Sequence, residues 1–461
     1  MSEVRSTDPY TGEPVFSAAA ADPSAVAAAV GAARAAQPAW VARGDRAGTL
    51  LRFAEAVEAA ADRLATLLVR EVGKRRADAV GEVAWTARSA RWYAEHPPAD
   101  EVAGAVRVLR RPIGVVAAVT PWNVPLITPA WKWLPALMAG NAVVWKPSER
   151  ATAVAVAAAG LLHGAGVPED VLRVLPGGPE TAAALAADER VGALHFTGSE
   201  EGGRALAALA APRFARVALE LGGLNPAVVL ADADLDLAAE CIVACATALA
   251  GQKCTSTRRV LVDAEVAGAL TERLAARVAA LRVGDPRDPA TDVGPLIGPD
   301  ARERAAAEVA RAVAAGAAVV ATAGGEGDAG AVATAGGAGG GGSALFPPVL
   351  LAGLAPGDPL RTRELFAPVL SIDPFTSPAE AWAGANAAPY GLAAAVYGRD
   401  PARLREAAAA IRSGVLAVNR RGDDVGLEAP FGGRGRSGNG QPEGGTYAYA
   451  ALTDYQAVYE G

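Results

Sequence analysis

At about 150 residues per domain, a chain of 461 residues should hold two or three domains with a large core. Hydrophobic residues make up 51% and charged residues 20%, which excludes a wholly disordered chain. The 43 Lys and Arg against 50 Asp and Glu give a net charge of −7, which argues against nucleic-acid or anionic-membrane binding and favours small-molecule partners. Three cysteines, no visible secretory signal and no uncharged apolar stretch near 20 residues lead us to expect a cytoplasmic protein without a membrane span.

The first hundred residues have the pattern of helices. Asp22-Pro23-Ser24 is a helix start signal, and apolar residues then recur at spacings of three and four through Val26, Val30 and Ala33. The same spacing predicts helices over 40–61 and 62–72.

From Ile113 onward, apolar β-branched runs alternate with helical patterns. We expect strands at 113–120, 142–146, 171–175, 193–197 and 227–230, and helices at 125–139, 151–162, 180–187, after 199 and at 235–250. Such alternation is typical of a parallel sheet, so the prediction is an α/β protein with a Rossmann-like, doubly wound sheet.

A second α/β series follows without a long linker, and we place the boundary near Asn225. Its predicted strands are 258–262, 318–321, 349–351, 369–372 and 394–397, and its helices are 265–281, 301–315, 378–387 and 401–411. Residues 322–343 are Gly/Ala-rich and predict a flexible surface loop.

Cys254 is the cysteine with a setting suited to chemistry. It follows Gly251-Gln-Lys in a polar turn, where a thiol can be exposed as a nucleophile, although a structural role is also compatible with the spacing. Cys241 and Cys245 lie four apart on one face of an alanine-rich helix and are expected to be buried and inert. Because the three histidines are scattered, we expect no metal site.

Two further residues have side chains suited to catalysis. Glu220 precedes two glycines that would let a ligand approach the backbone, so its carboxylate is either a general base or a solvated loop residue. Asn123 follows the first strand of the sheet, where α/β proteins bind ligands, and its amide could serve an oxyanion hole or simply a turn.

Seven motifs in order give these residues a context. They are Pro121-Trp-Asn-Val-Pro125, Trp145-Lys-Pro-Ser-Glu149, Phe196-Thr-Gly-Ser199, Glu220-Leu-Gly-Gly223, Gly251-Gln-Lys-Cys254, Glu364-Leu-Phe-Ala-Pro-Val369 and Pro430-Phe-Gly-Gly433. Through them the sequence strongly resembles the NAD(P)-dependent aldehyde dehydrogenases over nearly its whole length.

The resemblance implies a mechanism for oxidising an aldehyde to a carboxylic acid. Cys254 would attack the carbonyl, and the Asn123 amide with the Cys254 backbone N–H would hold the oxyanion of the thiohemiacetal. After hydride transfer, water activated by Glu220 would hydrolyse the thioester. Lys132 matches a family lysine of the proton relay, and a solvated helix charge is its alternative role.

The resemblance also implies a cofactor site. The matching residues are Trp122, Lys146, Ser148, Glu149, Gly178, Phe196, Ser199, Leu221, Glu364 and Phe366. A carboxylate at Glu149 would accept hydrogen bonds from ribose hydroxyls and repel a 2′-phosphate, which favours NAD, while Lys146 leaves NADP open.

The domain boundaries follow from the same resemblance. They are 1–100 and 112–224 for NAD binding, 225–430 for catalysis, and 101–111 with 431–461 for a small antiparallel extension through which the family forms homodimers or homotetramers. The family commonly has Gly at Ala367, and Lys at Leu224 and Gly435. A relay Glu is replaced here by Pro442, with Glu443 beside it.

Three other functions are alternatives. A cysteine hydrolase would need a histidine partner, a CoA-acylating dehydrogenase typically lacks the base that Glu220 provides, and a non-enzymatic protein would not retain the whole catalytic set. Lys253, Arg420 and Arg421 could attract an acidic semialdehyde. If Asp423 and Asp424 neutralise these cations instead, the apolar residues Val124, Trp131 and Phe431 would favour an aromatic or aliphatic aldehyde.

Overall fold

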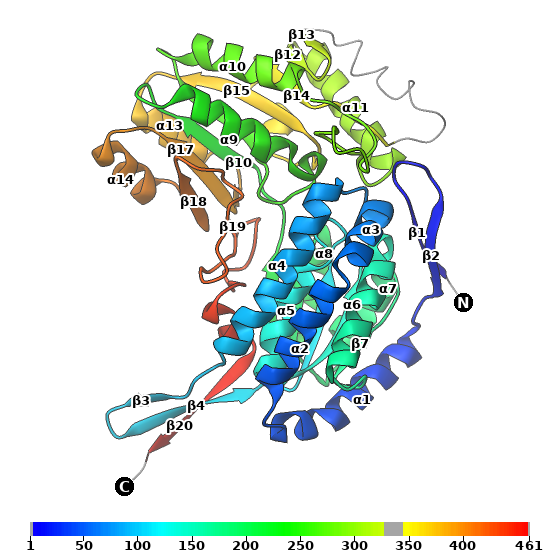
Figure 1. Ribbon diagram of the computed structural model, residues 1–461. Coiled ribbons are helices and arrows are strands. Elements are labelled where there is room, and N and C mark those ends of the chain that lie inside the picture. Colours follow the sequence, from blue (N-terminus) through cyan, green and yellow to red (C-terminus); the bar gives the residue numbers. More distant parts are fainter. Residues whose placement is uncertain (1–2, 327–343, 460–461) are drawn as a thin grey trace.

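The computed structural model describes residues 3–326 and 344–459 and has the expected α/β architecture. Two large sheets, each covered by helices, lie side by side, and a small antiparallel sheet projects from the body as an arm (Figure 1). Across the two described segments, every helix is too short or too polar for a membrane span.

An N-terminal hairpin that the sequence analysis missed precedes the helices. Strands β1 (Glu3–Thr7) and β2 (Pro14–Ala19) pair antiparallel. Helix α1 (Pro23–Ala42) begins as predicted, since the Asp22 side chain accepts a hydrogen bond from the Ala25 amide at 2.8 Å. The next helices are α2 (Arg46–Ala59), α3 (Ala61–Val72) and α4 (Arg76–Glu95).

The prediction of a single helix over 40–61 is wrong. The chain leaves the helix after Ala42 and resumes at Arg46, whose Nη1 donates to the carbonyl oxygens of Val41 at 2.7 Å and Arg43 at 3.0 Å. The guanidinium thereby satisfies acceptors that a continuing helix would have paired internally. Apolar spacing does not reveal this break, because both helices keep an apolar face toward the core.

The first sheet is wholly parallel, in the order β7-β6-β5-β8-β9. Its strands are β5 (Val115–Thr120), β6 (Ala142–Pro147), β7 (Leu172–Val174), β8 (Val191–Thr197) and β9 (Arg216–Glu220). The helices that follow four of them are α5 (Ile127–Met138), α6 (Thr152–Ala165), α7 (Pro179–Ala187) and α8 (Glu200–Ala210).

Strand β5 shows why this sheet is doubly wound. Val116 and Ala118 belong to the core formed with α2 to α6, whereas Val115, Ala117 and Val119 belong to the opposite core with α1, α7 and α8. Alternate side chains of one strand thus enter different cores, so both faces are covered.

The second sheet is mixed, in the order β13-β12-β14-β15-β11-β10-β17-β18, with β12 antiparallel to both β13 and β14. Its strands are β10 (Asn225–Val229), β11 (Thr257–Asp263), β12 (Ala318–Thr322), β13 (Gly325–Glu326), β14 (Val349–Ala352), β15 (Val369–Phe375), β17 (Ala393–Tyr397) and β18 (Val415–Val418). Its helices are α9 (Leu235–Thr247), α10 (Ala267–Ala279), α11 (Pro299–Ala314), α13 (Pro378–Ala385) and α14 (Pro401–Ala410). Most of the predicted Gly/Ala-rich loop, residues 327–343, lies outside the described residues.

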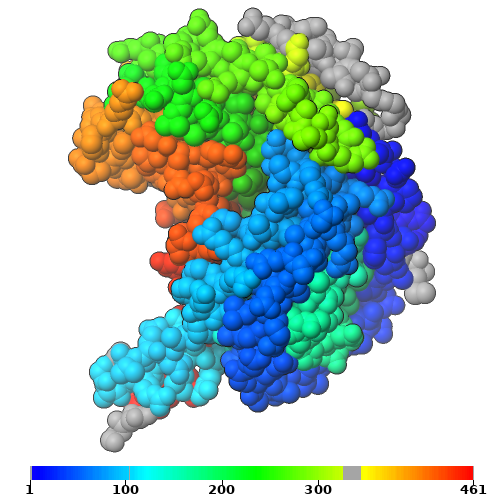
Figure 2. Space-filling model, in the orientation of Figure 1, coloured from blue at the N-terminus to red at the C-terminus, as the bar shows by residue number. Residues whose placement is uncertain are grey.

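The arm consists of β3 (Glu101–Ala103), β4 (Val106–Pro112) and β20 (Thr453–Tyr459), antiparallel in the order β20-β4-β3. It stands clear of the body (Figure 2). Of the segment 431–461 that was predicted to belong to the extension, only Thr453–Tyr459 forms a strand of the arm. Residues Thr446–Ala451 form a 3₁₀ helix instead, because Tyr449 is buried there and its hydroxyl donates to the His96 carbonyl at 2.8 Å. A further small ladder joins β16 (Tyr390–Gly391) to β19 (Arg434–Gly435).

Candidate active site

Cys254 lies on a loop that leaves helix α9 by a sharp reversal. Helix α9 ends at Thr247, three residues earlier than predicted, and a 3₁₀ turn (Ala248–Gly251) follows. Leu249 and Ala250 adopt left-handed φ angles of 52° and 54°, which L-residues rarely adopt. Gly251 follows at φ 71°, and a Cβ there would lie 2.5 Å from the backbone of Ala367. This tight packing fixes the path of the chain into Cys254.

The thiol of Cys254 opens into a cavity of about 280 Å³. Its lining residues are Gly81, Trp85, Val124, Ile127, Thr128, Trp131, Thr197, Glu220, Lys253, Cys254, Thr255, Asp423, Asp424, Val425, Phe431 and Glu443. Burial, followed by the negative charge of Glu364, raises the pKa of Cys254 to about 12. The resting side chain is therefore a protonated thiol. Cys241 and Cys245 are buried as predicted, and neither is among the residues that line this cavity.

Glu220 ends strand β9, and its buried carboxyl group faces the same cavity. The Gly433 amide donates to it, and a Cβ on Gly432 would lie 2.9 Å from its Oε1. Burial, and then the nearby carboxylate of Glu443, hold the pKa of Glu220 well above its ordinary value. A carboxylate with a raised pKa suits general base work.

Lys132 is not the solvated helix charge that we weighed as an alternative. It is fully buried on α5 and forms an ion pair with Glu443, which lies 311 residues later in the chain. His195 Nδ1 lies 3.9 Å from Glu443 Oε1, and burial with the Lys132 charge lowers the pKa of His195 to about 3. The ring is neutral, so Lys132 is the cation that balances Glu443. Glu443 thus lines the cavity and pairs with Lys132.

The start of helix α5, which carries Lys132, is held by a second buried ion pair. Glu82 binds Lys74, and its Oε1 accepts hydrogen bonds from the amides of Leu126 at 2.8 Å and Ile127 at 3.3 Å. A carboxylate at a helix N-terminus satisfies free amides and favours the helix dipole.

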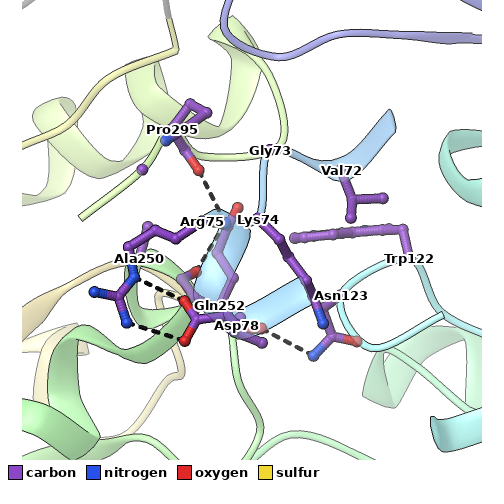
Figure 3. Close-up of a pocket in the computed structure, with 12 residues that line it drawn as sticks. Val72, Gly73, Lys74, Arg75, Asp78, Trp122, Asn123, Ala250, Gln252 and Pro295 are labelled. Carbon is purple, nitrogen blue, oxygen red and sulfur yellow. Dashed lines mark hydrogen bonds and ion pairs between the residues drawn. The ribbon is translucent and has the colours of Figure 1, made fainter. Parts of the chain in front are cut away.

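Asn123 lies in a smaller pocket next to the main cavity, beside Trp122 and Gln252 (Figure 3). Its side-chain Nδ2 donates to the Gln252 carbonyl at 2.8 Å, two residues before the nucleophile. In turn, Gln252 Oε1 accepts from the Ile297 amide at 2.7 Å. The Asn123 amide is thereby fixed against the Cys254 loop, and its NH₂ group has a second N–H to donate.

The residues expected to bind a cofactor gather at one edge of the first sheet, where its strands end. Trp122 follows β5, Lys146 and Ser148 end or follow β6, Gly178 lies between β7 and α7, Phe196 is on β8, and Leu221 follows β9. Ser199 caps α8 by accepting from the Gly202 amide at 3.1 Å. Lys146 Nζ lies 3.3 Å from Glu149 Oε2. The carboxyl edge of a parallel sheet is the place where such folds bind nucleotides.

Glu364 and Phe366 reach this edge from the segment before strand β15 of the second sheet. A Cβ on Gly222 would lie 1.9 Å from Glu364 Oε2, so the Glu364 carboxyl group occupies the space left by the missing side chain. Glu364 Oε1 lies 3.8 Å from Arg258 Nη2 and has no hydrogen-bond partner among the described residues, although it is buried. Burial raises the pKa of Glu364 to about 7. The ring of Phe366 meets that of Trp122 edge-on, 5.7 Å between centroids. An unpartnered buried carboxyl oxygen, a capped helix start and aromatic rings fit a dinucleotide.

The comparison with known proteins agrees with this geometry. The sequence profile of the aldehyde dehydrogenase family matches residues 1–458. The chain belongs to the aldehyde dehydrogenase family. It is therefore an oxidoreductase that acts on aldehydes with NAD or NADP, as the motifs predicted.

Two relatives and one solved structure illustrate the similarity. The 3,6-anhydro-alpha-L-galactose dehydrogenase of Streptomyces coelicolor is 37% identical, covering 95% of this chain and 89% of the relative. The succinate-semialdehyde dehydrogenase of Paenarthrobacter nicotinovorans is 36% identical, covering 94% and 95%. The structure of PnpE in complex with nicotinamide adenine dinucleotide has a TM-score of 0.91 at 32% identity, covering 99% of this chain and 94% of PnpE.

Sequence reasoning about this aldehyde dehydrogenase missed one wall of the cavity. Gly81 and Trp85 come from α4, a helix that the motif analysis did not single out, and Ile127 and Thr197 also line the cavity. The spacing of Gly81 and Trp85 was the signal that could have found them, since residues four apart lie on the same face of a helix. Arg420 and Arg421, expected near the aldehyde path, do not line the cavity. Asp424 and Asp423 bind them instead.

Proposed function

We propose that this aldehyde dehydrogenase oxidises its aldehyde through a covalent intermediate on Cys254 and releases the carboxylic acid by hydrolysis. The observation that carries the proposal is that Cys254 and Glu220, 34 positions apart in the sequence, line one cavity. The sulfur attacks the aldehyde carbon, forming a C–S bond and a thiohemiacetal. The Asn123 amide and the Cys254 backbone N–H stabilise the oxyanion.

The proton of the Cys254 thiol must leave before the attack, because its raised pKa keeps it protonated at neutral pH. Glu220 is the ionisable group of the cavity suited to take it, through water, and later to remove a proton from the water that hydrolyses the thioester. Lys132 and Glu443 lie behind Glu220 and influence its pKa in opposite directions. We assign this buried pair the proton relay from Glu220.

For the cofactor we propose NAD rather than NADP. Trp122, Lys146, Ser148, Glu149, Gly178, Phe196, Ser199, Leu221, Glu364 and Phe366 would hold it. Bound there, the nicotinamide would accept the hydride that leaves the thiohemiacetal carbon. The Glu149 carboxylate is part-exposed beside Lys146, and a Cβ on Gly178 would lie 3.2 Å from its Oε1. That carboxylate can bind ribose hydroxyls and repels a 2′-phosphate.

Substitutions of Cys254 and of Glu220 should have different effects on NADH formation. Cys254→Ala should abolish NADH formation from any aldehyde, whereas Cys241→Ala, a buried control, should retain it. Glu220→Ala should still give a burst of NADH of about one equivalent per site, because hydride transfer precedes hydrolysis. The burst should form more slowly than in the wild type, because the base that deprotonates the thiol is missing, and the steady state should be slowed as well. Full activity in Cys254→Ala overturns the proposal.

The same assay addresses the CoA-acylating alternative. Hydrolysis without CoA requires a base at the thioester, and Glu220 supports that outcome. We expect free carboxylic acid as the product, at a rate that added CoA leaves unchanged. An acyl-CoA product would instead favour the alternative.

We further propose the domain division predicted from the sequence and assembly into a homodimer or homotetramer through the arm. Strands β3 and β20 are the two edges of its sheet, and Val102, Tyr455 and Tyr459 are exposed on it. An exposed strand edge with large apolar side chains favours pairing with another subunit. A reducing compartment such as the cytoplasm is the proposed location, and the three unpaired cysteines support it.

A further inference from the structure

We propose that Asp423 makes this cavity reject aldehydes that carry a carboxylate, because it binds Lys253, which lines the cavity, together with Arg421. The inference rests on the proposed function and concerns the substrate class. The curated relatives do not decide it, since similar identities are found for proteins named for succinate semialdehyde and for 3,6-anhydro-galactose.

The Asp423 carboxylate is buried and takes charged partners from two sides. Its Oδ2 accepts from Lys253 Nζ at 2.8 Å, and its two oxygens accept from Arg421 Nε and Nη2 at 2.9 Å each. Bidentate charge-assisted bonds of this kind are short and strongly oriented. Lys253 stands directly before the nucleophile, so its ammonium is the cation that an anionic aldehyde would meet first.

The remaining cation of the loop is engaged as well. Arg420 forms an exposed ion pair with Asp424, whose side chain faces the cavity. The side chain of Arg421 is 44% exposed on the outer side of Asp423, where water screens its charge. Among the described residues that line the cavity, Lys253 is the single basic one, whereas Glu220, Asp423, Asp424 and Glu443 are acidic.

The rest of the wall is apolar. Trp131 and Phe431 meet edge-on with ring centroids 5.4 Å apart, and Trp85, Val124 and Val425 complete the surface around them. A carboxylate at the far end of the aldehyde would lose its hydration against these rings. It would gain no ion pair in return, because Lys253 already binds Asp423. An uncharged aromatic or aliphatic tail loses nothing comparable and buries apolar area.

A matched pair of substrates tests this selectivity. The measurement is the ratio of kcat/KM for 4-methylbenzaldehyde to that for 4-carboxybenzaldehyde, with NAD, in the full-length enzyme. The two aldehydes differ mainly in charge, so a general effect of a variant on the thiol cancels in the ratio. We expect the wild type to favour the methyl compound by tenfold or more.

Asp423→Asn should lower that ratio by tenfold or more, because Lys253 and Arg421 lose their anionic partner. The change should come from a higher kcat/KM for 4-carboxybenzaldehyde. A gain on one substrate is not a result that misfolding can give. Asp236→Asn is the matched control, since its ion pair with Arg273 is exposed and it does not line the cavity, and it should leave the ratio within twofold. In Lys253→Gln, kcat/KM for 4-carboxybenzaldehyde should not fall relative to kcat/KM for 4-methylbenzaldehyde. This second variant keeps the inference testable if Asp423→Asn does not fold.

Three outcomes overturn the inference: a wild type that prefers 4-carboxybenzaldehyde, an Asp423→Asn ratio equal to that of the wild type, or a selective loss of the carboxylate compound in Lys253→Gln. Absence of NADH formation from every aldehyde would instead count against the proposed function. The two failures are therefore distinguishable.

Discussion

Replacing Glu443 by Gln removes one charge from the most deeply buried ion pair of the site. The side chains of Lys132 and Glu443 are 0% and 3% exposed, and the neighbouring His195 is neutral. In Glu443→Gln, Lys132 would keep its charge with Glu220 as the remaining carboxyl group nearby. Removing one partner of a buried ion pair costs about 3–5 kcal/mol. Because Glu220 can ionise to replace part of the lost charge, we expect the lower end of that range.

The same substitution should change catalysis in a defined direction. Repulsion from Glu443 raises the pKa of Glu220, so its removal should lower that pKa and ionise the base at lower pH. An activated ester such as p-nitrophenyl acetate can acylate Cys254 without the cofactor, and the steady release of p-nitrophenol then reports thioester hydrolysis. The acidic limb of the pH profile of this rate should move to lower pH in Glu443→Gln.

A matched control separates burial from charge. Glu58 pairs with Arg91 at the surface, where the side chains are 52% and 39% exposed, so Glu58→Gln should cost no more than about 1 kcal/mol. Denaturant unfolding of both variants measures the two free energies. If Glu443→Gln also costs less than about 1 kcal/mol and its hydrolysis profile does not move, the assignment of a buried, charged Lys132–Glu443 pair is refuted.

Three further predictions concern the thiol, the cofactor and the assembly. Because the pKa of Cys254 is about 12, the rate at which iodoacetamide alkylates this thiol in the cofactor-free enzyme should rise about tenfold per pH unit up to pH 10. Mass spectrometry of the peptide that contains Cys254 measures this rate. A rate that stops rising below pH 9 would contradict the prediction. Glu149→Gln should raise the kcat/KM ratio of NADP to NAD about tenfold by removing repulsion of a 2′-phosphate, and an unchanged ratio argues that Glu149 does not face the ribose. Sedimentation at micromolar concentration should give a dimer or tetramer. A stable monomer of 46.3 kDa would rule out assembly through the arm.

The sequence predicts those parts of the fold that are buried on both faces. Every residue of β5 and β6 is buried, so each strand appears as a continuous apolar run. Strand β9 lies at the edge of its sheet and mixes buried with half-buried residues, which leaves no such run. The N-terminal hairpin was missed for the same reason, since β2 has no buried residue.

The site was predictable where a motif holds both the residue and its setting. Cys254 and Glu220 each lie beside glycines whose missing side chains make room for the chain or a carboxylate, and the structure brings both to one cavity. The partner of Lys132 could not be found in this way. Glu443 reaches it because a bridge between Phe431 and Glu443 turns the C-terminal segment back toward Glu220, a contact between distant segments that local spacing does not encode.

The charges around the cavity also hold its walls together. Lys132–Glu443 joins α5 to the C-terminal segment, Lys253–Asp423 joins the nucleophile loop to the segment after β18, and Arg258–Glu364 joins β11 to the segment before β15. Each pair links segments more than 100 residues apart in sequence, and each includes or neighbours a group to which we assign a role at the aldehyde or the cofactor. Changing one of these charges should therefore alter stability and the pH dependence of catalysis together. The apolar wall of Trp131 and Phe431 carries no charge, so substitutions there should change the choice of aldehyde while leaving the pH profile in place.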